Sequence, residues 1–278
     1  MRRQEAAAQA PWLHTEVARR MAERLAIVKL QPARVLDWRA HAGGGAPELQ
    51  AAYPKALRLA VERQAGADAP APWWSSRRWI GARDGVLAEG ELARGEAQLV
   101  WANMALHSAT DPTRMIRQWH QALAIDGFLM FSTLGPGTLS ELQSLYTNQR
   151  WGPPMAPLVD MHDLGDMLVE AGFADPVMDQ ELITLTWASA EAALAELREL
   201  GANADPRRVA GLRTPRWRVH LLEALESSRS LRSDGRVGLT FELVYGHAFK
   251  PVPRARLAPE SHVPLEDLRA MVRAGRRP

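Results

Sequence analysis

The sequence contains no cysteine among its 278 residues. Disulfides, thiolate metal sites and a cysteine nucleophile are therefore excluded. No stretch approaches the ~18 uncharged apolar residues of a membrane span, and the first ten residues lack the apolar core of a signal peptide. The eight histidines show no metal-ligand spacing. We therefore expect a soluble, cytoplasmic protein that needs neither a membrane nor a metal.

The charge of the chain is unevenly distributed. Residues 201–278 carry 15 Lys and Arg against 8 Asp and Glu, whereas residues 1–200 carry 19 against 24. A basic end on an acidic body suggests an acidic partner, and a solvated arginine-rich surface is the alternative. The basic residues are not interleaved with exposed aromatics or a known reader motif, so we expect no nucleic acid partner.

Apolar runs of strand length alternate with segments of helical periodicity, which predicts an α/β fold with a mostly parallel sheet and helices on both faces. The expected strands are Ala33–Trp38, Leu57–Val61, Trp79–Ala82, Gln98–Leu106, Phe128–Leu134, Val177–Trp187 and Val237–Phe249. The expected helices are Trp12–Leu30, Ala46–Tyr53, Pro112–Ala124, Thr138–Asn148, Asp160–Ala171, Ala190–Leu200, Pro215–Ser227 and Pro264–Arg273. A capping box of Thr138 and Glu141 is expected to begin the fourth helix.

The first strand ends in Asp37 and leads into a turn that contains three adjacent glycines, Gly43 to Gly45. An acid, Glu62, directly follows the second strand. This order is how a doubly wound sheet holds an adenosine cofactor, because a carboxylate there can accept both ribose hydroxyls. The turn lacks the Gly-x-Gly-x-x-Gly spacing of dinucleotide enzymes, which argues against a nicotinamide cofactor. A flexible loop is the alternative interpretation of the glycines.

Several longer motifs make the chain resemble the malonyl-acyl carrier protein O-methyltransferases of biotin synthesis. They are Trp12–Leu25, Arg34–Asp37, Leu99–Leu106, Phe131–Leu142, Val159–Asp179, Leu185–Trp187 and Asp234–Pro251. The resemblance implies a Rossmann-like, seven-stranded methyltransferase sheet with a helical lid insertion. It further implies methyl transfer from S-adenosylmethionine to the free carboxylate of a malonyl thioester, which is carried by an acyl carrier protein.

The resemblance also implies an organisation for the chain and a set of site residues. We expect one domain over residues 1–278, with a cofactor-binding half at 31–135, a helical lid and substrate region at 136–232, and a last strand with a basic tail at 233–278. The cofactor residues that it implies are Asp37, Gly43, Glu62 and Asn103. Candidate substrate residues are Arg207 and Arg208, for which surface arginines are the alternative.

The implied methyl transfer needs few catalytic groups from the protein. A sulfonium carries its own leaving group and a carboxylate needs no general base, so positioning and desolvation can supply the catalysis. We therefore expect no catalytic triad, and no catalytic residue is identified.

Four positions depart from the pattern of the family. Arg39 and His41 replace two glycines of the cofactor loop, and Arg83 stands where an acid follows the third strand, with Asp84 one residue later. Gln98 also replaces an acid that commonly precedes the fourth strand. The alternative hypothesis is thus an inactive methyltransferase-like protein that has lost cofactor binding and serves as a protein-binding module.

Overall fold

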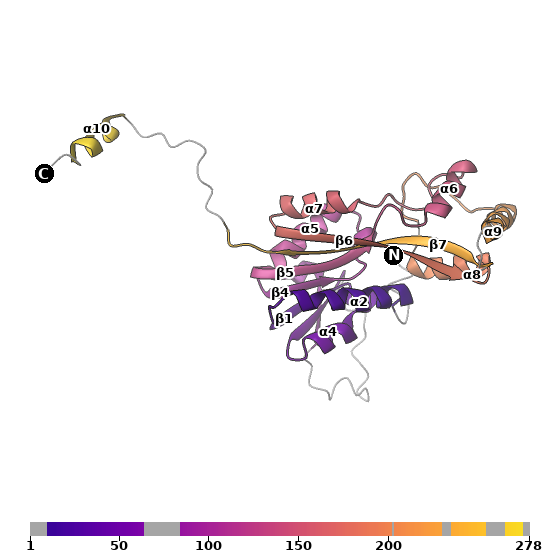
Figure 1. Ribbon diagram of the computed structural model, residues 1–278, viewed down its shortest axis with the longest axis horizontal. Helices are drawn as coiled ribbons and strands as arrows, with labels where there is room; N and C mark the ends of the chain where they lie inside the picture. Colours follow the sequence, from indigo (N-terminus) through magenta and orange to yellow (C-terminus); the bar gives the residue numbers. More distant parts are fainter. Residues whose placement is uncertain (1–9, 64–83, 202, 230–234, 254–264, 275–278) are drawn as a thin grey trace.

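The computed structural model describes residues 10–63, 84–201, 203–229, 235–253 and 265–274 (Figure 1). Seven strands form one sheet in the order β3-β2-β1-β4-β5-β7-β6. β1 pairs in parallel with β2 and β4, and β2–β3 and β4–β5 are parallel too, whereas β7 is antiparallel to both its neighbours. The expected mostly parallel sheet is confirmed. The strands are β1 Arg34–Trp38, β2 Leu57–Glu62, β3 Asp84–Ala88, β4 Ala97–Ala102, β5 Leu123–Leu134, β6 Ala174–Trp187 and β7 Val237–Phe249.

Helices cover both faces of the sheet. In Figure 1, α5 and α7 lie on one side of the strands and α2 and α4 on the other, while α6, α8 and α9 gather at one end of the sheet. The α-helices are α2 Trp12–Arg24, α3 Ala40–Gly43, α4 Ala46–Ala52, α5 Pro112–Ala122, α6 Ser140–Asn148, α7 Met161–Glu170, α8 Ala190–Leu200, α9 Pro215–Arg229 and α10 Leu265–Ala274. Short 3-10 turns lie at Leu25–Ile27, Glu89–Glu91 and Leu106–Ser108. No helix of the described segments is long and apolar enough to cross a membrane.

Two buried clusters, one on each face of the sheet, hold these layers together. Successive residues of β5 divide between them: Phe128 and Met130 belong to the cluster that includes α2, and Leu129 and Phe131 to the cluster under α5. This follows from the alternation of side chains along a strand. Both faces of this central strand are therefore apolar, which explains its continuous hydrophobic run.

Side-chain caps set the beginnings of several helices. Asp111 accepts a hydrogen bond from the backbone N–H of Arg114 at 2.9 Å, and Pro112 occupies the first turn of α5. Asp160 caps α7 in the same manner, accepting from the N–H of His162 at 2.8 Å. Each cap satisfies a donor that the helix itself leaves without a partner.

The expected capping box of α6 is wrong. The helix begins at Ser140, and the Thr138 hydroxyl is hydrogen-bonded to the backbone N–H and C=O of Glu242, both at 3.2 Å. The Glu141 carboxylate accepts from the N–H of Thr240 at 3.0 Å and from its hydroxyl at 2.6 Å. Both residues therefore bind α6 to β7 instead of capping the helix.

The expected position of the third strand is also wrong. The strand that pairs with β2 is β3, Asp84–Ala88, in which Asp84 lies opposite Arg58 at the amino end of the pairing. The segment Trp79–Ala82 and Arg83 lie outside the described residues. Asp84 is the first residue of β3 and lies at its amino end. It therefore cannot be the acid that follows the carboxyl end of this strand.

Candidate functional site

The turn after β1 is built on two left-handed residues, Arg39 and Gly44. Arg39 adopts φ 56° and ψ 43°, and its backbone N–H donates to the carbonyl of Val61 at 2.7 Å. The chain then forms the short helix α3 and leaves it through Gly44, whose φ is 69°. At Gly45, a Cβ atom would lie 2.5 Å from Nε1 of Trp101. Gly45 is thus required by the packing of the turn against β4, which is a structural role within the fold.

Asn103 follows β4 and holds this turn in place. Its Nδ2 donates to the carbonyls of His14 at 2.7 Å and Gly43 at 2.6 Å, and its Oδ1 accepts from the Ser132 hydroxyl at 2.6 Å. The side chain is 1% exposed. Asn103 therefore connects α2, the turn after β1, β4 and β5 by hydrogen bonds, and it lies beside Gly43.

Two carboxylates stand at the carboxyl ends of neighbouring strands. Glu62 ends β2, and Glu89 directly follows β3, whose last residue, Ala88, pairs with Glu62. One oxygen of Glu62 accepts the backbone N–H of His41 at 3.0 Å. The sequence analysis missed Glu89, because it placed the third strand too early; the correct strand end would have identified it.

The structure also shows the surroundings of the other positions that the sequence analysis singled out. Asp37 is buried in β1, and its carboxylate is 3.1 Å from the guanidinium of Arg58 on β2, so this acid pairs with the neighbouring strand. The His41 side chain is exposed, and its backbone contacts Glu62. Gln98 accepts the backbone N–H of Arg34 at 2.9 Å. Of the departures from the family pattern that the structure describes, Arg39 is the one whose side chain reaches the ends of the strands.

A cavity of about 900 Å³ lies beyond the ends of β4 and β5. Its walls come from the turn after β4, the segment between β5 and α7, and helices α8 and α9. Most of the lining is apolar, including Leu142, Leu197 and Phe241. Among the described lining residues there are three arginines and no carboxylate; the arginines are Arg198, Arg213 and Arg218. The cavity is therefore apolar with a positive charge.

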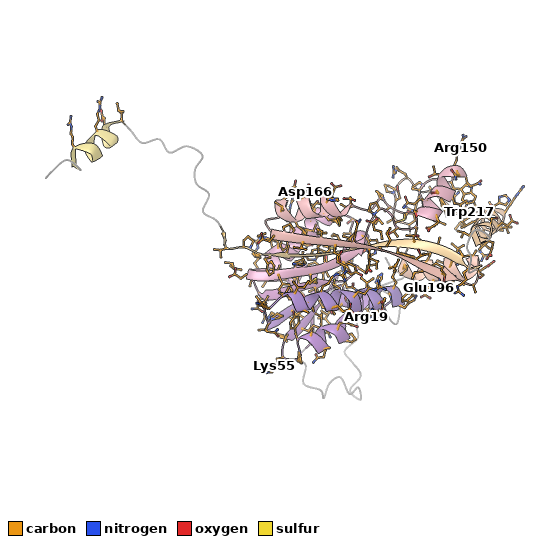
Figure 2. All side chains as sticks on the ribbon, viewed as in Figure 1. Arg19, Lys55, Arg150, Asp166, Glu196 and Trp217 are labelled. Atoms are coloured by element: carbon orange, nitrogen blue, oxygen red, sulfur yellow. The ribbon has the colours of Figure 1, made fainter. Side chains whose placement is uncertain are left out.

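Arg213 is fixed against the wall of this cavity. One of its guanidinium nitrogens donates to the carbonyl of Trp151 at 2.5 Å, and its central carbon lies 4.6 Å from the ring centroid of Trp217. Trp151, Trp217 and Tyr146 form a cluster with ring centroids 5.4–6.2 Å apart. Figure 2 shows Trp217 near the end of the molecule that α6 and α9 form. Since a guanidinium has five N–H donors, the bond to Trp151 leaves donors for an anion in the cavity.

The two arginines that the sequence proposed for the substrate lie on the rim. Arg207 is 73% exposed and pairs with the buried carboxylate of Asp205 at 3.0 Å, and Arg208 donates to the Asp205 carbonyl at 3.1 Å. Arg207 lines a second cavity of about 610 Å³, which shares Tyr146 and the segment 154–158 with the first. No pattern in the sequence distinguishes these rim residues from Arg213, which lines the cavity itself.

Two buried histidines connect the cofactor turn to the cavity. His14 of α2 contacts the carbonyl of Ala42 through Nδ1 at 2.7 Å, and its ring lies 6.2 Å from that of His107, which lines the cavity. Burial, together with the charge of His14, lowers the pKa of His107 to about 3. At neutral pH His107 is therefore uncharged.

Comparison with solved structures defines the class of protein. The YcgJ protein of Bacillus subtilis aligns with a TM-score of 0.56 at 12% identity, covering 84% of this chain and 98% of that chain. Phosphoethanolamine N-methyltransferase 2 of Haemonchus contortus, solved in complex with S-adenosyl-L-methionine, aligns with a TM-score of 0.50 at 17% identity, covering 84% and 52%. At such identities the likeness shows the fold alone, and that fold is the Rossmann-like fold of the methyltransferases.

Comparison with curated sequences then gives the family. No protein-family model matches the chain. The malonyl-acyl carrier protein O-methyltransferase of Gallionella capsiferriformans is 40% identical over 251 residues, covering 87% of this chain and 85% of that protein. The enzyme of the same name from Laribacter hongkongensis is 40% identical over 254 residues, covering 88% and 84%. The chain belongs to the malonyl-acyl carrier protein O-methyltransferase family, which confirms the resemblance drawn from the motifs.

Proposed function

We propose that the chain transfers a methyl group from S-adenosylmethionine to the free carboxylate of a malonyl thioester carried by an acyl carrier protein. The observation that carries this proposal is the apolar cavity whose described lining holds three arginines and no acid. It lies at the carboxyl ends of β4 and β5, where an open α/β sheet binds its ligands. Family membership supplies the substrate class.

The cavity suits both ends of such a substrate. A malonyl carboxylate needs cationic partners when it leaves water, and Arg213 presents a guanidinium that the Trp217 ring and the Trp151 carbonyl already hold in place. Apolar walls accept the rest of the thioester and exclude water. Desolvation leaves the carboxylate oxygens more reactive toward an electrophilic methyl group.

The cofactor turn fits S-adenosylmethionine in part. The close-packed glycine turn and the carboxylates of Glu62 and Glu89 stand where this class of fold holds an adenosine. When bound, the cofactor supplies the methyl group together with its own leaving group. The side chain of Arg39 reaches Glu89 across this region, so the residues fit the cofactor only once Arg39 has moved.

The protein groups then orient the substrate and perform no proton transfer. Arg213 directs the carboxylate, and His107, which burial keeps uncharged, forms part of the wall. Methyl transfer to a carboxylate releases no proton, so no general base is required. Catalysis in this proposal comes from orientation and from the exclusion of water.

The rim of the cavity offers a surface for the carrier protein. We define the basic rim as the three exposed arginines Arg207, Arg208 and Arg216, which lie on the segment before α9 and on its first turn. Acyl carrier proteins are acidic, so complementary charge would steer their approach and orient the thioester toward the cavity. Arg213 and Arg218, from the same basic segment, line the cavity instead.

A direct methylation assay tests the proposal. Purified protein is incubated with S-adenosylmethionine and malonyl-acyl carrier protein, and mass spectrometry should detect the methyl ester of the carrier-bound malonyl group. Arg213→Gln should slow the reaction at least tenfold, whereas Arg117→Gln, on exposed α5, should not change it. No ester under conditions where the Gallionella relative forms it would overturn the proposal and favour the cofactor-free binding module.

A further inference from the structure

The ends of β2 and β3 bring two carboxylates into register at the edge of the sheet. Glu62 closes β2, and Glu89 follows the residue that pairs with it. Two like charges so placed repel each other unless a cation or a hydrogen-bonding ligand lies between them. In a cofactor-loaded methyltransferase sheet, the nucleoside would provide the hydrogen-bond donors.

Here a side chain of the protein provides them. Nε and Nη2 of Arg39 both donate to the same oxygen of Glu89, at 2.8 and 2.7 Å. The side chains are 11% and 20% exposed, so this ion pair is largely withdrawn from water. Glu62 adds a second attraction: burial lowers the pKa of the Arg39 guanidinium, and the charges of Glu89 and Glu62 oppose that shift.

The backbone of Arg39 also contributes to this arrangement. The residue adopts a left-handed conformation that L side chains disfavour, and glycine would adopt it without strain. The hydrogen bond from its N–H to the carbonyl of Val61 holds the base of the side chain beside the carboxyl end of β2. An arginine that starts there and ends at Glu89 must cross the region in front of Glu62.

We infer that Arg39 is an internal competitor for the nucleoside half of the cofactor site, held by Glu89 and displaced when the cofactor binds. The inference rests on the proposed function and deepens it, because it assigns to one residue the control of cofactor affinity. Cofactor binding must break the Arg39–Glu89 pair before Glu89 can meet a ligand. The affinity of the wild-type chain is therefore lower than the acids and the glycine turn would otherwise give.

The size of the effect follows from the type of bond. Two hydrogen bonds between charged groups that are largely shielded from water correspond to about a tenfold to hundredfold change in affinity. A purely structural role for the pair predicts the opposite result, since its loss would loosen the turn and weaken binding. The sign of the change therefore separates the two roles.

The test measures binding of S-adenosylhomocysteine by calorimetry, without any turnover. Arg39→Gly should bind at least tenfold more tightly than the wild type, and thermal unfolding should show that it remains folded, because glycine accepts the left-handed conformation. Arg19→Ala is the matched control: it removes an arginine that pairs with Glu16 and Glu23 on exposed α2, and its affinity should equal that of the wild type.

Equal, measurable affinity in the wild type and Arg39→Gly would overturn the inference and leave the proposed function standing. Undetectable binding in both would overturn the inference and also remove the cofactor from the proposed function.

Discussion

Asn103 offers the sharpest test of how the cofactor turn is held. Asn103→Ala removes three hydrogen bonds of 2.6–2.7 Å from a side chain that is 1% exposed. Each bond contributes about 1 kcal/mol, and a buried polar group left without a partner costs about 1–3 kcal/mol. We therefore expect a loss of about 2–4 kcal/mol in the free energy of unfolding, or roughly 5–15 °C in Tm for a chain of this size.

A double-mutant cycle makes the assay specific. Ser132 donates to Asn103 and accepts from the N–H of Met104 at 3.0 Å, so Ser132→Ala also destabilises the protein. Because the two residues share one bond, the double variant should fall short of the sum by about 1 kcal/mol. Asn148→Ala, on exposed α6, is the asparagine control and should change stability by less than about 0.5 kcal/mol. Additive losses, or an Asn103→Ala cost no larger than the control, would refute the reasoning.

Three further predictions follow from the cavity and its rim. Arg213→Gln should raise KM for malonyl-acyl carrier protein more than it lowers binding of S-adenosylhomocysteine, as steady-state kinetics and calorimetry can show. Charge reversal of the whole basic rim to glutamate should slow association with carrier protein at low salt, and the difference should shrink at high salt; equal rates would exclude electrostatic docking. The pKa of His107 is depressed to about 3. In the unfolded chain His107 binds a proton as the pH falls below about 6.5, whereas in the folded chain it stays uncharged down to about pH 3. The free energy of unfolding should therefore decrease by up to about 1.4 kcal/mol for each unit that the pH is lowered between these values. His107→Gln should flatten this fall in urea titrations, whereas His220→Gln, at an exposed position of α9, should not.

The elements that sequence predicted well are those with strong local patterns. β7 and α8 begin and end where expected, since a long run of β-branched and aromatic residues and a capped amphipathic segment each specify one structure. β3 was misplaced because Asp84–Ala88 is short and lies at the edge of the sheet, with Val86 about half exposed. Such a strand has little apolar alternation to reveal it.

The site was predictable to the extent that its residues follow strand ends. Glu62 and Asn103 were proposed in this way, and the structure places them at the ends of β2 and β4, whereas Glu89 was missed because β3 was misplaced. The capping box failed for a different reason: Thr138 and Glu141 carry the right local pattern, but their partners lie on β7, about a hundred residues away. Contacts of this separation leave no periodic signal in the sequence.

The arrangement around Asn103 explains how the turn accommodates Arg39 without losing its shape. Asn103 fixes the far end of the turn through the Gly43 carbonyl, and Val61 fixes its start through the backbone of Arg39. Neither bond involves a side chain at the positions where glycines have been replaced. The framework of the turn is thus independent of the residue at position 39, and a change there alters what fills the nucleoside region while the turn stays in place. The competition that we infer for Arg39 therefore requires no rebuilding of the fold that positions this side chain.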